Sequence, residues 1–206
     1  MSDLRFLTHV CNSPLIQDKE FVLSLVQNQT LTPKLLHELF HKCDFEKFDL
    51  TDYRTQKILA YIVQHPYSTP RLIDQIDAMF SGSVPFVVLS AITQSMKVPS
   101  TILDRKEYII TDSRIAKNVA GNLSSSEGIL DELLYHPEPE VVLEAVVNPN
   151  TKPDDIRTFL AEASGIHHLI VEYANEILEK TSSITDHLEK DTVDKLKDQV
   201  RRVYAF

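Results

Sequence analysis

Apolar positions recur along this chain in short helical patterns, and a polar segment interrupts them at regular intervals. Residues 140–160 show the pattern most clearly, with the sequence EVVLEAVVNPNTKPDDIRTFL. A short apolar helix pattern ends at Asn-Pro-Asn-Thr-Lys-Pro, and a second pattern opens on acidic residues. Proline suits the first turn of a helix because its missing N–H would have no partner there in any case. The segment therefore predicts a helix, a tight break and a second helix.

The same pattern occurs four more times upstream. In each copy a polar residue stands five positions before a proline or glutamate; the pairs are Asn28 with Pro33, His65 with Pro70, Gln94 with Pro99, Asn122 with Glu127, and Asn148 with Pro153. In the copy without proline, Ser124 and Glu127 have the spacing of a capping box.

Apolar residues occupy matched positions on both sides of these breaks. Before the breaks stand the pairs Leu25-Val26, Ile62-Val63, Ala91-Ile92, Val119-Ala120 and Ala145-Val146. After them come Leu36 and Leu39, Ile73 and Ile76, Ile102, Leu130 and Leu133, and Ile156 and Phe159, with Arg105 as the exception in the third copy. Agreement at so many positions predicts an internal repeat.

Neither helix of a unit is long enough to be stable alone, since isolated helices shorter than about 12–15 residues are marginal in water. Stacking the units buries the faces that they share. We therefore expect an all-α fold, an α–α superhelix (solenoid) of about five short helix–turn–helix repeats. A single domain would span residues 1–206, with an N-terminal cap at 1–17, repeats at 18–160 and a C-terminal pair of capping helices at 161–206.

Four segments depart from the repeat pattern. A short helix is predicted for Asp3 to Cys11, and residues 44–53 are expected to form an inserted loop. Residues 108–110 have some strand character but are interpreted as a connector. A longer amphipathic helix is predicted from Ile166 to Leu178, followed by a break at residues 181–183 and a last helix that carries Val193, Leu196, Val200 and Val203.

Composition limits the partners of such a fold. The 206 residues are 43% hydrophobic and 25% charged, as is usual for a globular protein that buries a core. The formal charge of -9 disfavours a phosphate backbone as the partner, so nucleic acid is not expected. No stretch approaches the roughly 18 apolar residues that would span a bilayer. Cys11 and Cys43 are expected to be reduced thiols packed wholly or partly in the core, and the chain is expected to be cytoplasmic.

The repeat residues resemble a known family. The segment AVVNPNTKP at residues 145–153 and the copy at residues 65–70 are similar to the leucine-rich repeat variant family and to HEAT-like α-solenoids, over roughly residues 18–160. The resemblance implies a right-handed curved stack used mainly for protein contacts. Some variant-repeat proteins carry an iron–sulfur cluster on a cysteine-rich N-terminal segment. This chain has two cysteines in all, so no cofactor is expected.

In helical solenoids one helix of each unit lines the concave side, and its non-core positions make the contacts. With the second helices as that set, the candidate partner-binding residues are Lys34, His37, Glu38, Arg71, Asp74, Gln75, Asp131, Glu132, Arg157 and Thr158. Their charges are mixed, with more acid in the later copies. They predict a protein or peptide partner of some basic character, and a solvated face is the alternative.

One short motif suggests chemistry. His37-Glu38-Leu39-Phe40-His41 fits H-E-x-x-H, in which two histidines hold zinc and the glutamate activates water. The repeat pattern already explains Leu39 and Phe40 as core residues, and the following Lys42 is unusual for a zinc peptidase. The third-ligand candidates Cys43, Asp44, Glu46 and His65 stand in no known spacing. We expect a solvated helix face and no catalytic residue, with a zinc-dependent hydrolase or a nucleic-acid-binding HEAT-like protein as alternatives.

Three further features have structural interpretations. His167 and His168 are expected to lie on a helix surface. Asp154 and Asp155 open a helix, where acids interact favourably with the helix dipole. Asn28, Asn122 and Asn148 are expected to satisfy backbone groups in the tight breaks.

Overall fold

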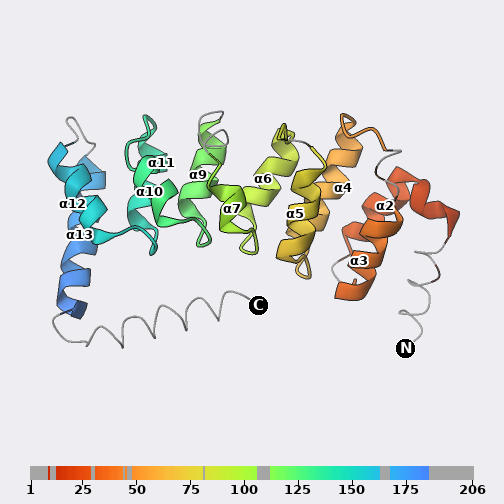
Figure 1. Cartoon of the computed structure of the whole chain (residues 1–206), viewed down its shortest axis with the longest axis horizontal. Helices are drawn as coiled ribbons and strands as arrows, with labels where there is room; N and C mark the ends of the chain where they lie inside the picture. Colours follow the sequence, from red (N-terminus) through yellow and green to blue (C-terminus); the bar gives the residue numbers. More distant parts are fainter. Residues whose placement is uncertain are drawn as a thin grey trace. The chain divides into compact units, whose positions relative to one another are not determined.

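The computed structural model describes residues 9, 13–28, 31–43, 45, 48–80, 82–105, 112–162 and 168–185, without the side chains of 182–185. These residues are helical or lie in turns, and none of them forms a strand (Figure 1). The helix predicted at residues 3–11, the connector at 108–110 and the last helix near residues 193–203 lie outside the described residues. None of the described helices is both long and apolar enough to cross a membrane.

Backbone contacts divide the chain into two compact units, Met1–Val98 and Pro99–Phe206. The described helices of the first unit are the 3₁₀ helix η1 (Pro14–Gln17) and the α-helices α2 (Lys19–Val26), α3 (Pro33–Lys42), α4 (Tyr53–Gln64), α5 (Pro70–Ala78) and α6 (Phe86–Gln94). Helix α4 packs against α2, α5 and α6, and η1 packs against α2. Gly82 has a φ of 92° in the turn before α6, a conformation that residues with a Cβ rarely adopt.

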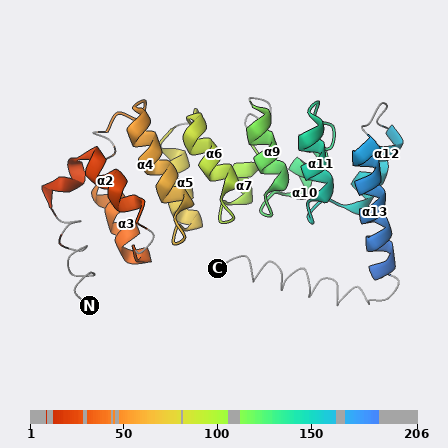
Figure 2. The same ribbon diagram turned by 180° about the vertical axis from the view of Figure 1, so that it is seen from behind.

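The described helices of the second unit are α7 (Ser100–Leu103), α9 (Ser113–Gly121), α10 (Glu127–Leu133), α11 (Pro139–Val147), α12 (Pro153–Glu162) and α13 (His168–Thr185). Helix α11 packs against α9 on one side and α13 on the other (Figure 2). Helix α10 contacts α9 and α11, and α12 contacts α13. The single stack of repeats over the whole chain stays a prediction.

Each of the five predicted breaks joins two helices through the same turn. The residue that ends the turn's first helix is Asn28, His65, Ser95, Asn122 or Asn148. Its N–H donates to the carbonyl three residues earlier at 3.0–3.3 Å, and its own carbonyl accepts from the N–H three residues later at 2.8–3.3 Å. These hydrogen bonds satisfy backbone groups that the helix end would otherwise leave unpaired.

The polar side chain at this position holds the turn. Asn122 Oδ1 accepts from the Ser124 N–H at 2.8 Å, and Asn148 Oδ1 accepts from the Asn150 N–H at 2.9 Å. His65 Nδ1 and Ser95 Oγ accept from the N–H two residues later in the same way. The expected role of Asn122 and Asn148 in satisfying backbone groups is therefore confirmed.

The third copy is shifted by one residue from its predicted register. Helix α6 ends at Gln94, Ser95 takes the turn position, and Pro99 is the N-cap of α7, which begins at Ser100. Proline is tolerated at an N-cap as well as at the first helical position, so a proline alone does not fix the register. Helix α7 ends at Leu103, and Arg105 therefore occupies no core position.

Two sequence interpretations are wrong. Ser124 does not cap α10, because Ser126 Oγ accepts from the Ile129 N–H and Glu127 is the first helical residue. The predicted break at residues 181–183 is helical within α13. Thr181 remains in the helix because its hydroxyl donates to the Ile177 carbonyl at 2.8 Å, which satisfies the side chain without breaking the backbone pattern.

The matched apolar positions form the core of both units. All of them are buried except Leu25, which is half-buried, and Arg105 in the third copy. The inserted loop adds Phe45 and Phe48, whose buried rings lie 5.4 Å apart between centroids. The Cys43 side chain is buried, as expected, whereas Cys11 lies outside the described residues.

Candidate functional site

The ten candidate partner-binding residues lie on α3 and α5 in the first unit and on α10 and α12 in the second. Eight of them are exposed, and Glu38 and Gln75 are half-buried. Lys34 Nζ lies 3.9 Å from Glu38 Oε1 on the same helix, so these opposite charges partly compensate each other. Among the candidates of the second unit, Asp131 lies in a more distinctive arrangement, beside Asp155.

Side chains of α10 and α12, and of the residues that flank these two helices, contact one another. We use the name α10–α12 surface for Glu127, Asp131 and Tyr135 together with Lys152, Asp155 and Glu162. At one end, Lys152 Nζ lies 2.7 Å from Glu127 Oε2. This hydrogen bond raises the pKa of Lys152 and keeps its ammonium group charged. The charges at this end of the surface are therefore balanced.

In the middle of the surface two carboxylates of like charge act on each other. Burial raises the pKa of Asp155, and the negative charge of Asp131 raises it further, while Lys152 opposes the shift. The helix dipole explains an acid at this position, as the sequence analysis proposed, but it does not remove the repulsion from Asp131. The middle of the surface therefore carries negative charge in excess of the nearby positive charge.

Tyr135 lies at the other end of the surface. Its ring is 48% exposed and packs edge-on against Phe159 with centroids 5.6 Å apart. Its hydroxyl donates to Glu162 Oε2 at 3.1 Å. Partial burial, this hydrogen bond and the negative charge of Glu162 raise the pKa of Tyr135, so the hydroxyl stays protonated and keeps donating to Glu162.

Asp131 is one of the candidates predicted from the sequence, whereas Tyr135 is not among them. Glu127, Asp131 and Tyr135 are spaced by four residues, and this spacing alone could have placed them on one face of the chain. Arg157 and Thr158 are occupied within α12, since the Arg157 guanidinium pairs with Asp154 and the Thr158 hydroxyl donates to the Asp154 carbonyl. Glu132 is exposed beside Asp131.

No family model, curated protein or solved structure matches this chain. Its function is therefore argued from its own residues.

The H-E-x-x-H motif lies on α3 with both imidazole rings exposed. Among the residues that the structure describes, no group of three or more His, Cys, Asp or Glu side chains could hold a metal. The buried Cys43 thiol donates to the Ile16 carbonyl. Both ring nitrogens of His65 already bond to the backbone, to the Asn28 carbonyl and the Tyr67 N–H. Asp44 and Glu46, the other suggested ligands, lie outside the described residues.

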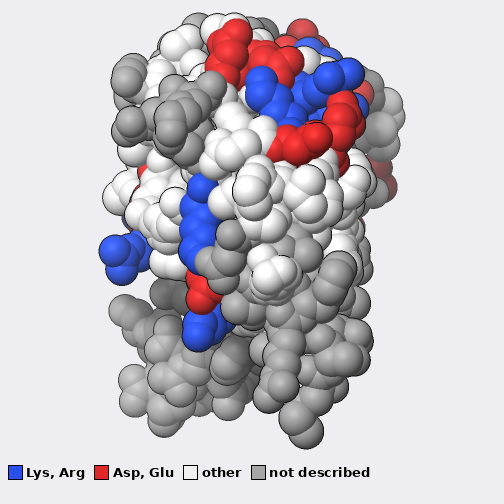
Figure 3. Space-filling model, turned by 90° about the vertical axis from the view of Figure 1, so that its right-hand side faces the viewer, with Lys and Arg blue, Asp and Glu red and all other residues white. Residues whose placement is uncertain are grey.

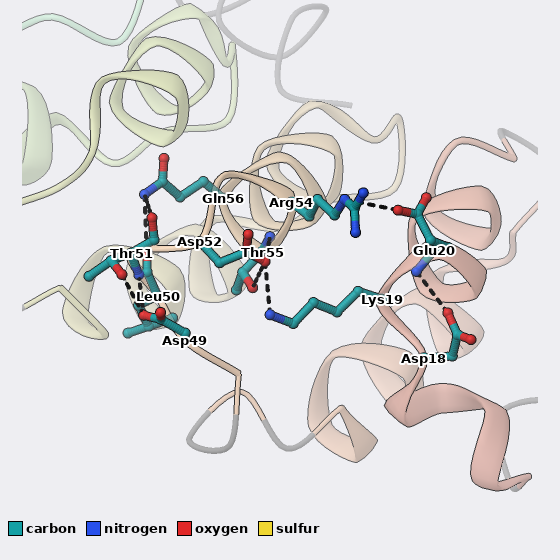
Figure 4. A network of polar contacts seen from close by, with 10 residues as sticks. All are labelled: Asp18, Lys19, Glu20, Asp49, Leu50, Thr51, Asp52, Arg54, Thr55 and Gln56. Atoms are coloured by element: carbon teal, nitrogen blue, oxygen red, sulfur yellow. Dashed lines mark hydrogen bonds and ion pairs between the residues drawn. The ribbon is translucent and has the colours of Figure 1, made fainter.

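Polar contacts in the first unit also join the first helices of neighbouring copies. Lys19 Nζ lies 2.8 Å from Asp52 Oδ2, and Arg54 Nε lies 2.9 Å from Glu20 Oε1 (Figure 4). Asp18 and Asp52 cap α2 and α4, so these residues hold the two helices in place. Among the described residues on the face drawn in Figure 3, acidic and basic side chains lie next to each other, and uncharged residues surround them. This charge distribution does not point to a polyanion-binding face.

Proposed function

We propose that the chain is a protein-interaction scaffold, built as an α-solenoid of helical repeats, whose α10–α12 surface binds a basic segment of a protein partner. The observation that carries this proposal is the excess negative charge around Asp131 and Asp155 beside the exposed ring of Tyr135. The five turns with the same hydrogen bonds support the repeat architecture.

A lysine or arginine of the partner would relieve the repulsion between Asp131 and Asp155. The gain exists in the complex alone, because Lys152 is the cation near Asp155 among the residues that the structure describes, and it is paired with Glu127. The partner's cation or its aliphatic stem would also contact the face of Tyr135, a residue type that is common at the centre of protein interfaces. Charge attracts the basic segment, and the aromatic ring adds contact area.

The test is fluorescence anisotropy of the full chain with a labelled lysine- and arginine-rich peptide, beside an acidic peptide of equal length. We expect the basic peptide alone to bind, and more weakly as salt rises, because exposed charges are screened over about 8–10 Å at 0.1–0.15 M salt. The variant Asp131→Asn/Asp155→Asn should weaken binding by about tenfold, which corresponds to roughly 1.4 kcal/mol.

The matched control removes the same amount of charge from the same unit at another place. Glu172 and Glu179 are exposed on α13, so Glu172→Gln/Glu179→Gln leaves the α10–α12 surface unchanged. We expect this control to bind within about twofold of the wild type. Equal weakening in both variants would show a general effect of net charge and contradict the proposed site.

A further inference from the structure

The two histidines of α3 are placed so that one ring nitrogen of each points at the other. His37 and His41 stand one helical turn apart, and their Nε2 atoms lie 3.1 Å from each other. The ring centroids are 4.2 Å apart, and the planes meet at 61°. In the metal-free protein this is an Nε2–H···Nε2 hydrogen bond, which requires at least one ring to be neutral.

From this geometry we propose that His37 and His41 form a two-histidine chelate for a divalent transition-metal ion. The proposal is independent of the α10–α12 surface, since it concerns another helix in the other unit. An ion bound at 2.0–2.1 Å from both Nε2 atoms at their present separation would have an N–metal–N angle of about 100°. This angle lies between the tetrahedral and octahedral values, so the rings need little movement.

A transition metal binds the neutral imidazole, so the charges around the pair affect its affinity. The charged groups near the pair are Lys34, Glu38 and Lys42 on α3 and Arg71 on α5. The positive charge of Lys34 is partly balanced by the carboxylate of Glu38. Arg71 is exposed, so solvent and salt screen its repulsion of a bound metal ion.

The donor set indicates which ions would bind. Two imidazole nitrogens suit copper, nickel and zinc, and for such a site Cu²⁺ is expected to bind most tightly of the first-row divalent ions. Mg²⁺ prefers oxygen ligands and is not expected to bind. The described residues around the pair provide no third ligand, so the remaining coordination positions are open to water. Such a site has two protein ligands, whereas a structural zinc site usually has four.

The test titrates the full chain with CuCl₂, and separately with ZnCl₂ and MgCl₂, by isothermal calorimetry at neutral pH. We expect one Cu²⁺ equivalent to bind at this site, Zn²⁺ to bind more weakly and Mg²⁺ to give no heat. His37→Ala and His41→Ala should each weaken Cu²⁺ binding on the order of 100-fold, because each leaves a single donor in place of a chelate. In NMR spectra of the wild type, the first Cu²⁺ added should broaden the ring signals of His37 and His41.

Two further variants separate the chelate from simpler explanations. His41→Ala/Lys42→His keeps the number of histidines on α3 but moves one off the shared face, so it should bind as weakly as His41→Ala. Glu38→Gln removes the carboxylate that a zinc peptidase would need and should bind Cu²⁺ like the wild type. Cu²⁺ binding at wild-type strength in either single alanine variant, or in the variant with the shifted histidine, would overturn the proposal.

Discussion

In the breaks at His65, Ser95, Asn122 and Asn148, one polar side chain at the end of the first helix accepts a hydrogen bond from the backbone of the turn. His65 does this as well as an asparagine does, because Nδ1 accepts from the Tyr67 N–H at 3.2 Å and Nε2 lies 3.3 Å from the Asn28 carbonyl. Only the neutral ring with its hydrogen on Nε2 can make both contacts. The hydrogen bonds of the break at His65 therefore depend on the protonation of the imidazole, whereas those of the breaks at Asn122 and Asn148 do not.

The stability of the protein should fall in mild acid through His65. Burial lowers the pKa of this histidine in the folded state, with Lys97 lowering it further and the Asn28 contact acting in the opposite direction. Below about pH 6.5 the imidazole of His65 takes up a proton in the unfolded chain, whereas in the folded protein it stays neutral until the pH reaches its lowered pKa. The free energy of unfolding therefore decreases as the pH falls from about 6.5 through the folded pKa. His65→Asn offers the same donor and acceptor without titrating, as Asn148 does in its own turn.

We expect the free energy of unfolding, measured with urea, to fall less between pH 7 and pH 5 in His65→Asn than in the wild type. One proton taken up by the unfolded state alone changes stability by at most about 1.4 kcal/mol per pH unit. Equal losses in the two proteins would show that His65 is not the group responsible.

At the scale of elements, the α10–α12 surface places like charges side by side at some cost to the fold. Asp154 and Asp155 both stand in the first turn of α12, where the helix dipole favours acids. They differ in their neighbours: Asp154 forms an ion pair with Arg157, whereas Asp155 lies close enough to Asp131 for the negative charge of Asp131 to raise its pKa. The two residues thus provide a comparison in which the dipole is the same and the partner differs.

Asp155→Asn should leave the protein more stable than Asp154→Asn at pH 7. The raised pKa of Asp155 means that its ionised form costs free energy in the folded state, so neutralising it removes repulsion. Asp154→Asn instead removes an ion pair. Thermal unfolding of both variants measures the difference, which we expect to be a few tenths of a kcal/mol, as for like-charge pairs on helices. A higher melting temperature for Asp154→Asn would contradict the assigned repulsion.

The sequence predicted the helices and breaks because the turn imposes a polar residue at a fixed distance from the next helix, as at Asn148 and Pro153. It failed where several residue types fit one position, as at Pro99, which is an N-cap, and at Ser126, which replaces Ser124. It also missed Tyr135 as a site residue, because the partner of this side chain is Glu162, on a helix of the next copy. Local patterns give the turns, whereas contacts between copies depend on how the helices pack.

At the scale of the whole chain, the two compact units should respond separately to damage. The amide nitrogen of Asn148 donates to the Ala120 and Asn122 carbonyls at 2.6 and 3.0 Å, which ties neighbouring breaks of the second unit together. Asn148→Ala removes both of these hydrogen bonds, while the Asn122 carbonyl keeps the one from the Ser125 N–H. The loss should cost about 0.5–1.5 kcal/mol for each hydrogen bond. Repeat units contact their neighbours alone, so the effect should fade with distance along the chain.

Hydrogen exchange measured by mass spectrometry should therefore show faster exchange in α9 to α12 of Asn148→Ala and unchanged exchange in α2 to α6. Asn175→Ala on the exposed side of α13 serves as the control, and its exchange should match the wild type. Equal acceleration in both units would mean that the chain unfolds as one cooperative body.

The hydrogen bonds between neighbouring breaks also have a direction. His65 bonds back to the Asn28 carbonyl, Lys97 donates back to the Pro66 carbonyl, and Asn148 and Asn150 donate back to carbonyls of the break before theirs. In each of these contacts the acceptor precedes the donor in the chain. During synthesis the acceptor thus leaves the ribosome before the donor in each of these contacts. Such an order lets a unit grow from its N-terminal end by adding one helix pair at a time.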